Sequence, residues 1–216
     1  MRSIITDEHI LKMSAKKIPY FKKIHRIKLR IDKSVYPTGK IGKLFYKTLS
    51  LPTMKLNNKM VLDYGTGTGF LAIAAALKGA RVIAIDQNLA AIKCTKYNAK
   101  QNKIDHLIDF RVAHNLSAIL PGEKFDLILA GLPWESAIPK TPLEMAFYDA
   151  RFSMRKALSK CAKILLNKNG IILLSYSQRM QNNAPMQHFF QGYKITVLLE
   201  AMINDEPHYI LRLKPR

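Results

Sequence analysis

From residue 59 onward, the chain alternates short apolar runs with longer segments in which apolar residues recur every three or four positions. The runs predict strands and the longer segments predict helices. The expected strands are 59–64, 81–86, 107–113, 125–130 and 170–176, and the expected helices are 69–79, 88–101 and 144–167. Because strands that alternate with helices form parallel sheets covered on both faces, we expect a doubly wound α/β fold.

The last part of the chain follows another pattern. A short helix is expected at 184–191, and it is followed by apolar runs at 193–201 and 206–213 with no helix between them. Consecutive strands joined by a short turn pair antiparallel. We therefore predict a mainly parallel, seven-stranded sheet that carries an antiparallel hairpin at one edge.

The first 58 residues have a pattern of their own. Ile18, Phe21 and Ile24 recur at helical spacing, although Pro19 interrupts the start. The pattern predicts a helix over 3–24, a half-buried strand over 27–32, a turn at 35–39 and a helix over 41–51. We expect residues 1–58 to be a basic N-terminal extension (helix, short strand, helix) that caps the site of a binding domain over 59–216.

Composition sets the class of protein. A chain of 216 residues, 48% of them hydrophobic, suits one globular domain with a full core. Its apolar runs are too short for a membrane span, and residues 1–10 contain no signal-peptide core, so we expect a cytoplasmic protein. Cys94 and Cys161 lie in helical patterns and are expected to be reduced thiols. The six histidines lack ligand spacing, so no metal site is predicted.

Charge adds a candidate partner. The chain has 35 Lys and Arg against 15 Asp and Glu, a net charge of +20. Residues 1–60 alone hold 15 basic and 3 acidic residues. A basic arm beside a binding domain indicates a polyanionic partner, with nucleic acid first, although a merely solvated basic surface is the alternative. The lysines of this arm include Lys16, Lys17, Lys22 and Lys23.

A glycine loop follows the first strand of the domain. Residues 61–69 read V-L-D-Y-G-T-G-T-G, and an apolar helix pattern begins at Phe70. Glycine allows positive φ and close approach of a ligand, and a helix start presents free N–H groups. The NAD fingerprint fails because position 70 is not glycine, and no Gly-Lys-Ser/Thr of a P-loop follows. The candidate ligand-binding residues of the loop are Gly65, Thr66, Gly67 and Gly69.

The second strand of the domain ends in an acid. V-I-A-I-D closes at Asp86, about 20 residues after the glycine loop, and Gln87 follows. An acid at this place typically accepts hydrogen bonds from ribose hydroxyls. We therefore add Asp86 and Gln87 to the candidate binding residues.

With Asp63 two residues before the first glycine, the loop reads D-x-G-x-G-x-G, which resembles the first motif of class I S-adenosylmethionine (SAM)-dependent methyltransferases. The resemblance implies a Rossmann-like sheet and SAM as cofactor, with Asp63 near the ammonium group and Asp86 at the ribose. In that fold, the end of the third strand usually contacts the adenine amino group. Here the candidates are His114 and Asn115, and the sequence does not choose between them.

The segment before the domain refines the resemblance. Residues 29–39 read L-R-I-D-K-S-V-Y-P-T-G, which looks like the entry to the group of release-factor glutamine and ribosomal small-subunit guanine methyltransferases. There, a short strand and a Pro-containing turn lie over the SAM site. The resemblance implies that Tyr36, Pro37 and Thr38 form one wall of the pocket. An ordinary turn is the alternative.

The fourth strand ends in a second motif, G-L-P-W-E, at residues 131–135. The methyltransferases named above, and adenine N6 enzymes, carry Asn/Asp-Pro-Pro-Tyr/Phe there, in which oxygens accept the hydrogens of the target amino group and the aromatic ring stacks on the substrate. By that resemblance, Pro133 matches the second proline and Trp134 the aromatic residue. Leu132 and Gly131 depart from the motif, so one acceptor oxygen is missing. Glu135 either supplies it or is a solvated loop acid, and Trp134 either stacks on substrate or packs on the core.

We therefore expect a SAM-dependent methyltransferase that modifies a nitrogen atom of a macromolecule, with RNA as the first choice because of the basic arm. A protein methyltransferase acting on glutamine or lysine is the enzymatic alternative. A SAM- or RNA-binding protein without turnover is the alternative of another class, because Gly131 lacks the expected acceptor. The oligomeric state is not predicted by the sequence.

Overall fold

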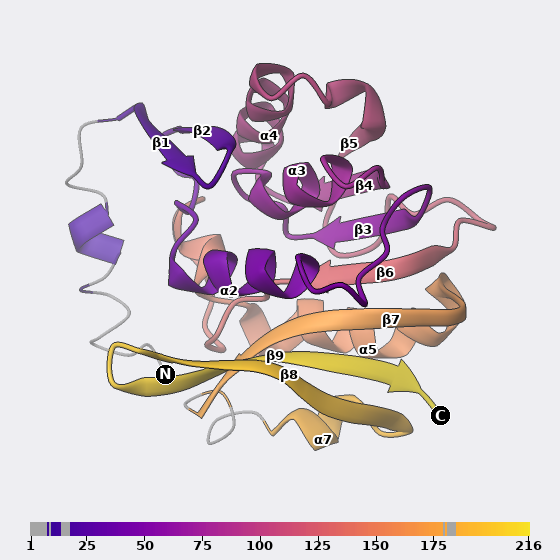
Figure 1. Ribbon diagram of the computed structural model, residues 1–216. Helices are drawn as coiled ribbons and strands as arrows, with labels where there is room; N and C mark the ends of the chain where they lie inside the picture. The colour runs from indigo at the N-terminus through magenta and orange to yellow at the C-terminus, as the bar shows by residue number, and fades with distance from the viewer. Residues whose placement is uncertain (1–7, 9, 14–17, 179, 181–184) are drawn as a thin grey trace.

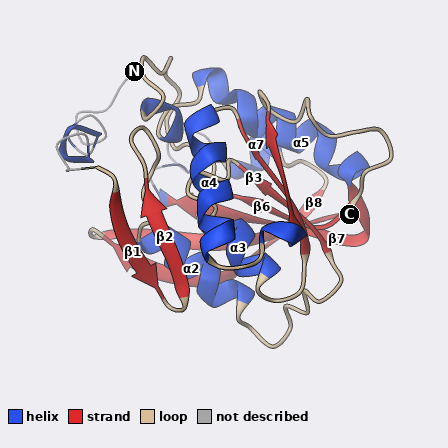
Figure 2. Ribbon diagram, turned by 90° about the horizontal axis from the view of Figure 1, so that it is seen from above, coloured by secondary structure: helices blue, strands red, loops and turns tan. Residues whose placement is uncertain are grey.

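A seven-stranded sheet with helices on both faces forms the body of the protein (Figures 1 and 2). The computed structural model describes residues 8, 10–13, 18–178, 180 and 185–216. The strands of the large sheet are β3 (Met60–Tyr64), β4 (Arg81–Asp86), β5 (Ile108–Val112), β6 (Phe125–Ala130), β7 (Leu166–Ser177), β8 (Tyr193–Ile203) and β9 (Glu206–Pro215). Their spatial order is β5-β4-β3-β6-β7-β9-β8, so the strand order reverses at β3.

The pairing confirms the predicted fold class. Strand β3 pairs in parallel with β4 and β6, and the parallel pairs β4–β5 and β6–β7 extend the sheet on both sides. Strand β9 pairs antiparallel with both β7 and β8, which makes the expected hairpin at one edge. The hairpin turns at Asn204 and Asp205, which both have positive φ, as a tight turn between twisted strands requires.

Helices cover the two faces of the sheet separately. On one face lie α2 (Lys40–Leu49), α3 (Phe70–Ala76) and α4 (Leu89–Gln101), and on the other lie α5 (Ser153–Leu165) and α7 (Met186–Phe189) (Figure 2). Alternate residues of each strand enter opposite cores: Val61 packs with the first group of helices and Leu62 with the second. Short 3₁₀ helices lie at Asp105–Leu107, Glu144–Ala146 and Ala150–Phe152.

The predicted helix over 3–24 is wrong at its end. Residues 20–24 form strand β1 (Tyr20–Ile24), which pairs antiparallel with β2 (Ile27–Ile31), while residues 10–13 are helical and 14–17 lie outside the described residues. The helical spacing misled because Phe21 is not a core residue: its side chain is 71% exposed. Pairing with β2, whose alternate residues are fully buried, outweighs the local pattern.

The predicted helix over 144–167 is also wrong in its first third. Residues 144–152 form two 3₁₀ turns, and α5 begins only at Ser153. Arg151 and Phe152 both have positive φ, which no α-helix accepts. Asp149 explains the start of α5, because its carboxylate accepts hydrogen bonds from Ser153 Oγ and from the backbone N–H of Met154.

The β1–β2 hairpin is fastened to α4 by two asparagine side chains. Asn98 accepts a hydrogen bond from Arg30 N (2.7 Å) and donates one to Arg30 O (2.9 Å). Asn102 does the same with Lys28, at 3.0 and 2.7 Å. Each amide side chain therefore makes the two backbone hydrogen bonds that a paired strand would make, and it holds the hairpin against α4. Within the described ranges, every helix is too short or too polar to cross a bilayer.

Candidate functional site

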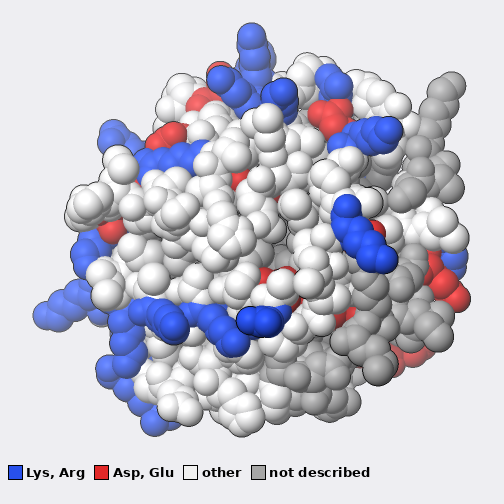
Figure 3. Space-filling model, turned by 180° about the vertical axis from the view of Figure 1, so that it is seen from behind, with Lys and Arg blue, Asp and Glu red and all other residues white. Residues whose placement is uncertain are grey.

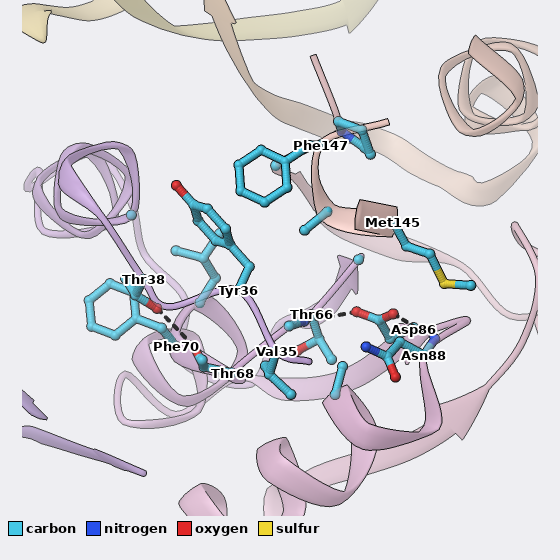
Figure 4. A pocket seen from close by; sticks show the side chains of 18 of the residues that line it. Val35, Tyr36, Thr38, Thr66, Thr68, Phe70, Asp86, Asn88, Met145 and Phe147 are labelled. Carbon is cyan, nitrogen blue, oxygen red and sulfur yellow. Dashed lines mark hydrogen bonds between the residues drawn. The ribbon is translucent and has the colours of Figure 1, made fainter. Parts of the chain in front are cut away.

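A cavity opens at the carboxyl ends of β3, β4 and β6, where open α/β sheets bind their ligands (Figure 4). The glycine loop and the end of β4 form its floor. The turn before α2 and α2 itself form one wall, and the chain after β6 forms the other. Among the described residues, no group of three or more His, Cys, Asp or Glu side chains is placed to hold a metal ion.

The three glycines of the loop have different roles. Gly65, Gly67 and Gly69 have φ of 81°, 56° and 79°, so all three occupy the left-handed region. A Cβ atom on Gly69 would lie 2.6 Å from Thr95, so this glycine permits close packing of α3 on α4, and it does not line the cavity. A Cβ atom on Gly67 would meet nothing within 4 Å, because this residue faces the open cavity.

Asp86 places its carboxylate at the cavity floor. Its Oδ2 accepts a hydrogen bond from Gly67 N and its Oδ1 accepts one from Asn88 N, both at 2.9 Å (Figure 4). Burial raises the pKa of Asp86, and the backbone donors oppose that rise. Gln87 also lines the cavity, and its Oε1 lies 2.8 Å from Nδ1 of the exposed His114.

Asp63 lies deeper, with 2% of its surface exposed, and still lines the cavity. Its Oδ2 accepts hydrogen bonds from Thr66 Oγ1 at 2.6 Å and from Ala72 N at 3.1 Å, so it ties the glycine loop to the first turns of α3. Its Oδ1 has no hydrogen bond from any described residue. Burial raises the pKa of Asp63 to about 6.

The turn before α2 is part of the cavity wall. Tyr36 and Thr38 line the cavity, whereas Pro37 does not. Thr38 Oγ1 lies 2.7 Å from Thr68 Oγ1, a hydrogen bond that joins the turn to the glycine loop. The ring of Tyr36 meets Phe147 edge-on, with 5.3 Å between centroids, so the two walls touch above the floor (Figure 4).

The G-L-P-W-E motif is divided between cavity and core. Gly131, Pro133 and Trp134 line the cavity, while Leu132 is 1% exposed and lies in the core. Glu135 is 4% exposed, which contradicts the solvated-acid interpretation, and it does not line the cavity either. Its backbone N–H donates to Phe147 O, and its carbonyl accepts from Asp149 N, so the loop returns beside it.

The third strand does not reach this cavity. His114 and Asn115 are both absent from its lining. Asn115 instead accepts a hydrogen bond from the hydroxyl of Tyr64 at 3.2 Å. Both candidates for the adenine amino group therefore stand one residue away from the cavity lining: His114 hydrogen-bonds to Gln87, which lines the cavity, and Asn115 to Tyr64, which precedes Gly65.

Several parts of the site were not expected from the sequence, and two of them flank the G-L-P-W-E motif. The first is an apolar lid that comprises Met145, Ala146 and Phe147, which the long predicted helix had concealed. The second is Arg155, which is 1% exposed and donates a hydrogen bond to Pro133 O at 3.3 Å. Its guanidinium packs against the adjoining rings of Phe152 and Phe189, at 4.9 and 5.3 Å from their centroids. In the sequence, Arg155 stands among the lysines of α5, and nothing in that pattern indicates that its side chain is buried.

Comparison with known proteins agrees with this geometry. Residues 47–132 match the family model described as ribosomal protein L11 methyltransferase. The chain is 42% identical over 73 residues to the L11 methyltransferase of Methylobacillus flagellatus, covering 33% of this chain and 23% of that protein. It is 33% identical over 112 residues to the release factor glutamine methyltransferase of Aliivibrio fischeri, covering 51% and 38%. The chain thus spans less than half the length of these two relatives.

Solved structures share the fold over most of the chain. The 16S rRNA N2 G1207 methyltransferase of T. thermophilus, in complex with AdoMet and guanosine, superposes with a TM-score of 0.69 at 16% identity, over 92% of this chain and 50% of that one. The M. jannaschii tRNA m1G37 methyltransferase superposes with a TM-score of 0.67 at 20% identity, over 94% and 56%. The sheet order and these structures together show that the chain has the fold of class I SAM-dependent methyltransferases, and residues 47–132 match the model of one such family.

Proposed function

We propose that this protein transfers the methyl group of SAM to a nitrogen atom of an RNA base. The observation that carries the proposal is that one cavity joins the SAM motif to the acceptor motif. Gly67 and Asp86 lie at its floor, and Gly131, Pro133 and Trp134 lie in its wall. A methyl donor and a flat acceptor can therefore meet in one enclosed space.

The residues present fit SAM, because the cavity floor is open at Gly67 and bears two carboxylates. We assign Asp86 to the ribose hydroxyls, Asp63 to the ammonium group and Thr38 to the wall beside the ligand. When bound, SAM supplies a methyl group on a sulfonium centre: the acceptor nitrogen forms a bond to it, and the electrons of the broken C–S bond return to sulfur. The backbone carbonyls of the motif accept acceptor N–H groups, and Trp134 stacks on the acceptor.

The basic hairpin supports an RNA acceptor. Lys23, Arg26 and Lys28 are exposed on β1–β2, and the neighbouring Lys22 donates a hydrogen bond to Thr38 O at 3.0 Å. The hairpin therefore adjoins the cavity wall. Lys16 and Lys17 lie outside the described residues. Figure 3 shows that Lys and Arg side chains are also spread over the face opposite to the view of Figure 1.

A protein acceptor is the second candidate. It is favoured by the relative named a release factor glutamine methyltransferase, which matches half of this chain. The test is incubation with tritiated SAM and the RNA and protein of a cell extract, followed by ribonuclease or protease. Label released by ribonuclease supports RNA, and label released by protease supports a protein. SAM binding without any incorporation would favour the non-catalytic alternative.

Trp134→Ala is expected to lower kcat by about tenfold and to leave the SAM dissociation constant unchanged, because stacking acts on the acceptor. Calorimetry and initial rates give the two quantities. Trp134 is the only tryptophan, so quenching of its fluorescence by acceptor RNA is an independent readout. Unchanged turnover of the variant would assign Trp134 to packing, in line with its contact to His208 at 6.0 Å between ring centroids.

RNA binding is expected to weaken steeply with salt, because phosphate contacts release counterions. Replacing Lys23, Arg26 and Lys28 by Gln should flatten the log–log slope by about 2 to 3, one contact for each lost cation. Salt titrations measure the slope. A control in which the exposed Lys156, Lys160 and Lys168 are replaced by Gln makes the same charge change away from the hairpin. Equal slopes in the two variants would refute hairpin docking and favour a protein acceptor.

SAM affinity is expected to rise with pH and to level off above about 6. Because burial raises the pKa of Asp63 to about 6, this carboxyl is protonated below that pH and cannot pair with the ammonium group. Because SAM is expected to bind the ionised form of Asp63, protonation of this carboxyl lowers the SAM affinity by at most about tenfold for each pH unit below the pKa. Calorimetry between pH 5 and 8 measures the effect. Asp63→Asn should bind weakly at every pH, and a pH dependence that survives in it would refute the assignment.

A further inference from the structure

The acceptor end of the cavity has an unfilled position at Gly131. A Cβ atom added there would meet nothing within 4 Å, and Gly131 is exposed to the cavity. Its φ is not positive, so the backbone does not require glycine. This is the position at which the related motif carries Asn or Asp. The space for an acceptor side chain is therefore present, although the side chain is not.

Strand β7 brings a hydroxyl group to the same place. Ala130 pairs with Leu174 in the parallel register of β6 and β7, so the next residues, Gly131 and Ser175, lie side by side. Ser175 is 2% exposed, and it lines the cavity. Its hydroxyl makes no hydrogen bond to any described residue.

The alternation of the strand directs this hydroxyl toward the cavity. Leu173 packs in the core that contains α2 and α3, and Leu174 packs in the opposite core. Ser175, two residues after Leu173, therefore points to the face of α2 and α3, on which the cavity lies. Asp63 occupies that face for the same reason, because Val61 packs in the α2–α3 core.

We propose that Ser175 Oγ accepts a hydrogen bond from the acceptor nitrogen and thereby replaces the missing oxygen at Gly131. The inference rests on the proposed N-methylation. As the nitrogen lone pair forms the N–CH₃ bond, the nitrogen gains positive charge, and its remaining N–H becomes a stronger donor to Ser175 Oγ. The proton is afterwards released to solvent. Ser175 acts on this developing charge, so its contribution belongs to the transition state more than to ground-state binding.

The experiment compares Ser175→Ala and Ser175→Cys with the unchanged protein. Both variants should lower kcat about tenfold, the effect of losing one hydrogen bond to a developing charge. SAM affinity in calorimetry and quenching of Trp134 by acceptor should stay the same. Adding Gly131→Asn to Ser175→Ala should restore most of the lost turnover, because the amide oxygen then occupies the open position. A merely structural serine would not be rescued in this way.

Ser177→Ala is the matched control. Ser177 lies two residues further along β7, is 3% exposed and accepts a hydrogen bond from Met180 N, but it does not line the cavity. Its loss should change the melting temperature and not kcat. If the unchanged protein transfers methyl groups and Ser175→Ala does so equally fast, or Gly131→Asn gives no rescue, the inference about Ser175 fails alone. If the unchanged protein binds SAM and transfers nothing, the proposed function fails with it.

Discussion

Gly67→Val is expected to reduce SAM affinity by at least about 100-fold, the largest effect of any single change at the floor of the cavity. Two costs combine. Gly67 has φ of 56°, which a β-branched residue rarely adopts. Its added side chain would also occupy the open space that faces the ligand. Calorimetric titration with SAM measures the loss.

Gly122→Val separates these two costs. Gly122 has φ of 86°, and a Cβ atom there would also meet nothing within 4 Å, but it lies outside the SAM cavity. The control therefore carries the backbone strain without the obstruction. It should lower the melting temperature and retain normal SAM affinity. Normal SAM binding by Gly67→Val itself would mean that the glycine loop is not the binding site.

Asp86→Ala is expected to weaken SAM binding by about tenfold or more, because each hydrogen bond from a ribose hydroxyl to a carboxylate contributes about 1.5–3 kcal/mol. The carboxylate is already held by Gly67 N and Asn88 N, so it meets the ribose without reorganisation. Asp86→Asn should be intermediate, since one oxygen remains. Calorimetry at fixed pH measures all three proteins.

The control for Asp86 is Asp126→Ala. Asp126 Oδ2 accepts a hydrogen bond from the backbone N–H of Met60 at 2.9 Å, the same length as the bond from Gly67 N to Asp86. It lies at the start of β6, away from the cavity. Its loss should cost stability and leave SAM affinity intact. Equal SAM affinities for Asp86→Ala and the unchanged protein would remove Asp86 from the ribose site.

Much of the fold could be predicted from the sequence, because the signals are local. Parallel strands buried on both faces need continuous apolar runs, and the runs at 81–86 and 125–130 became β4 and β6 with the predicted bounds. The glycine loop was recognisable because Gly65 and Gly67 have positive φ, a conformation that glycine adopts more readily than other residues. Because no helix separates the last two apolar runs, the sequence also predicted that they pair as an antiparallel hairpin, and β8 and β9 do so.

Part of the site could not be predicted, because it depends on contacts between distant segments. Residues 20–24 became a strand only because β2 pairs with them, and the start of α5 at Ser153 is held by hydrogen bonds from Ser153 Oγ and Met154 N to the carboxylate of Asp149. Glu135 reads as a polar loop residue, yet the returning loop at Phe147 and Asp149 covers it.

The sequence by itself determined the class of fold, the glycine loop with its acids and the place of the acceptor motif, since each is written in consecutive residues. The tertiary structure alone decided which candidates share a cavity. His114 and Asn115 lie outside it, while Ser175, which has no motif of its own, lies inside it. The reason is strand register: Ser175 reaches Gly131 only because β7 pairs with β6 at Leu174 and Ala130. A shift of one residue would have turned its hydroxyl to the opposite face of the sheet.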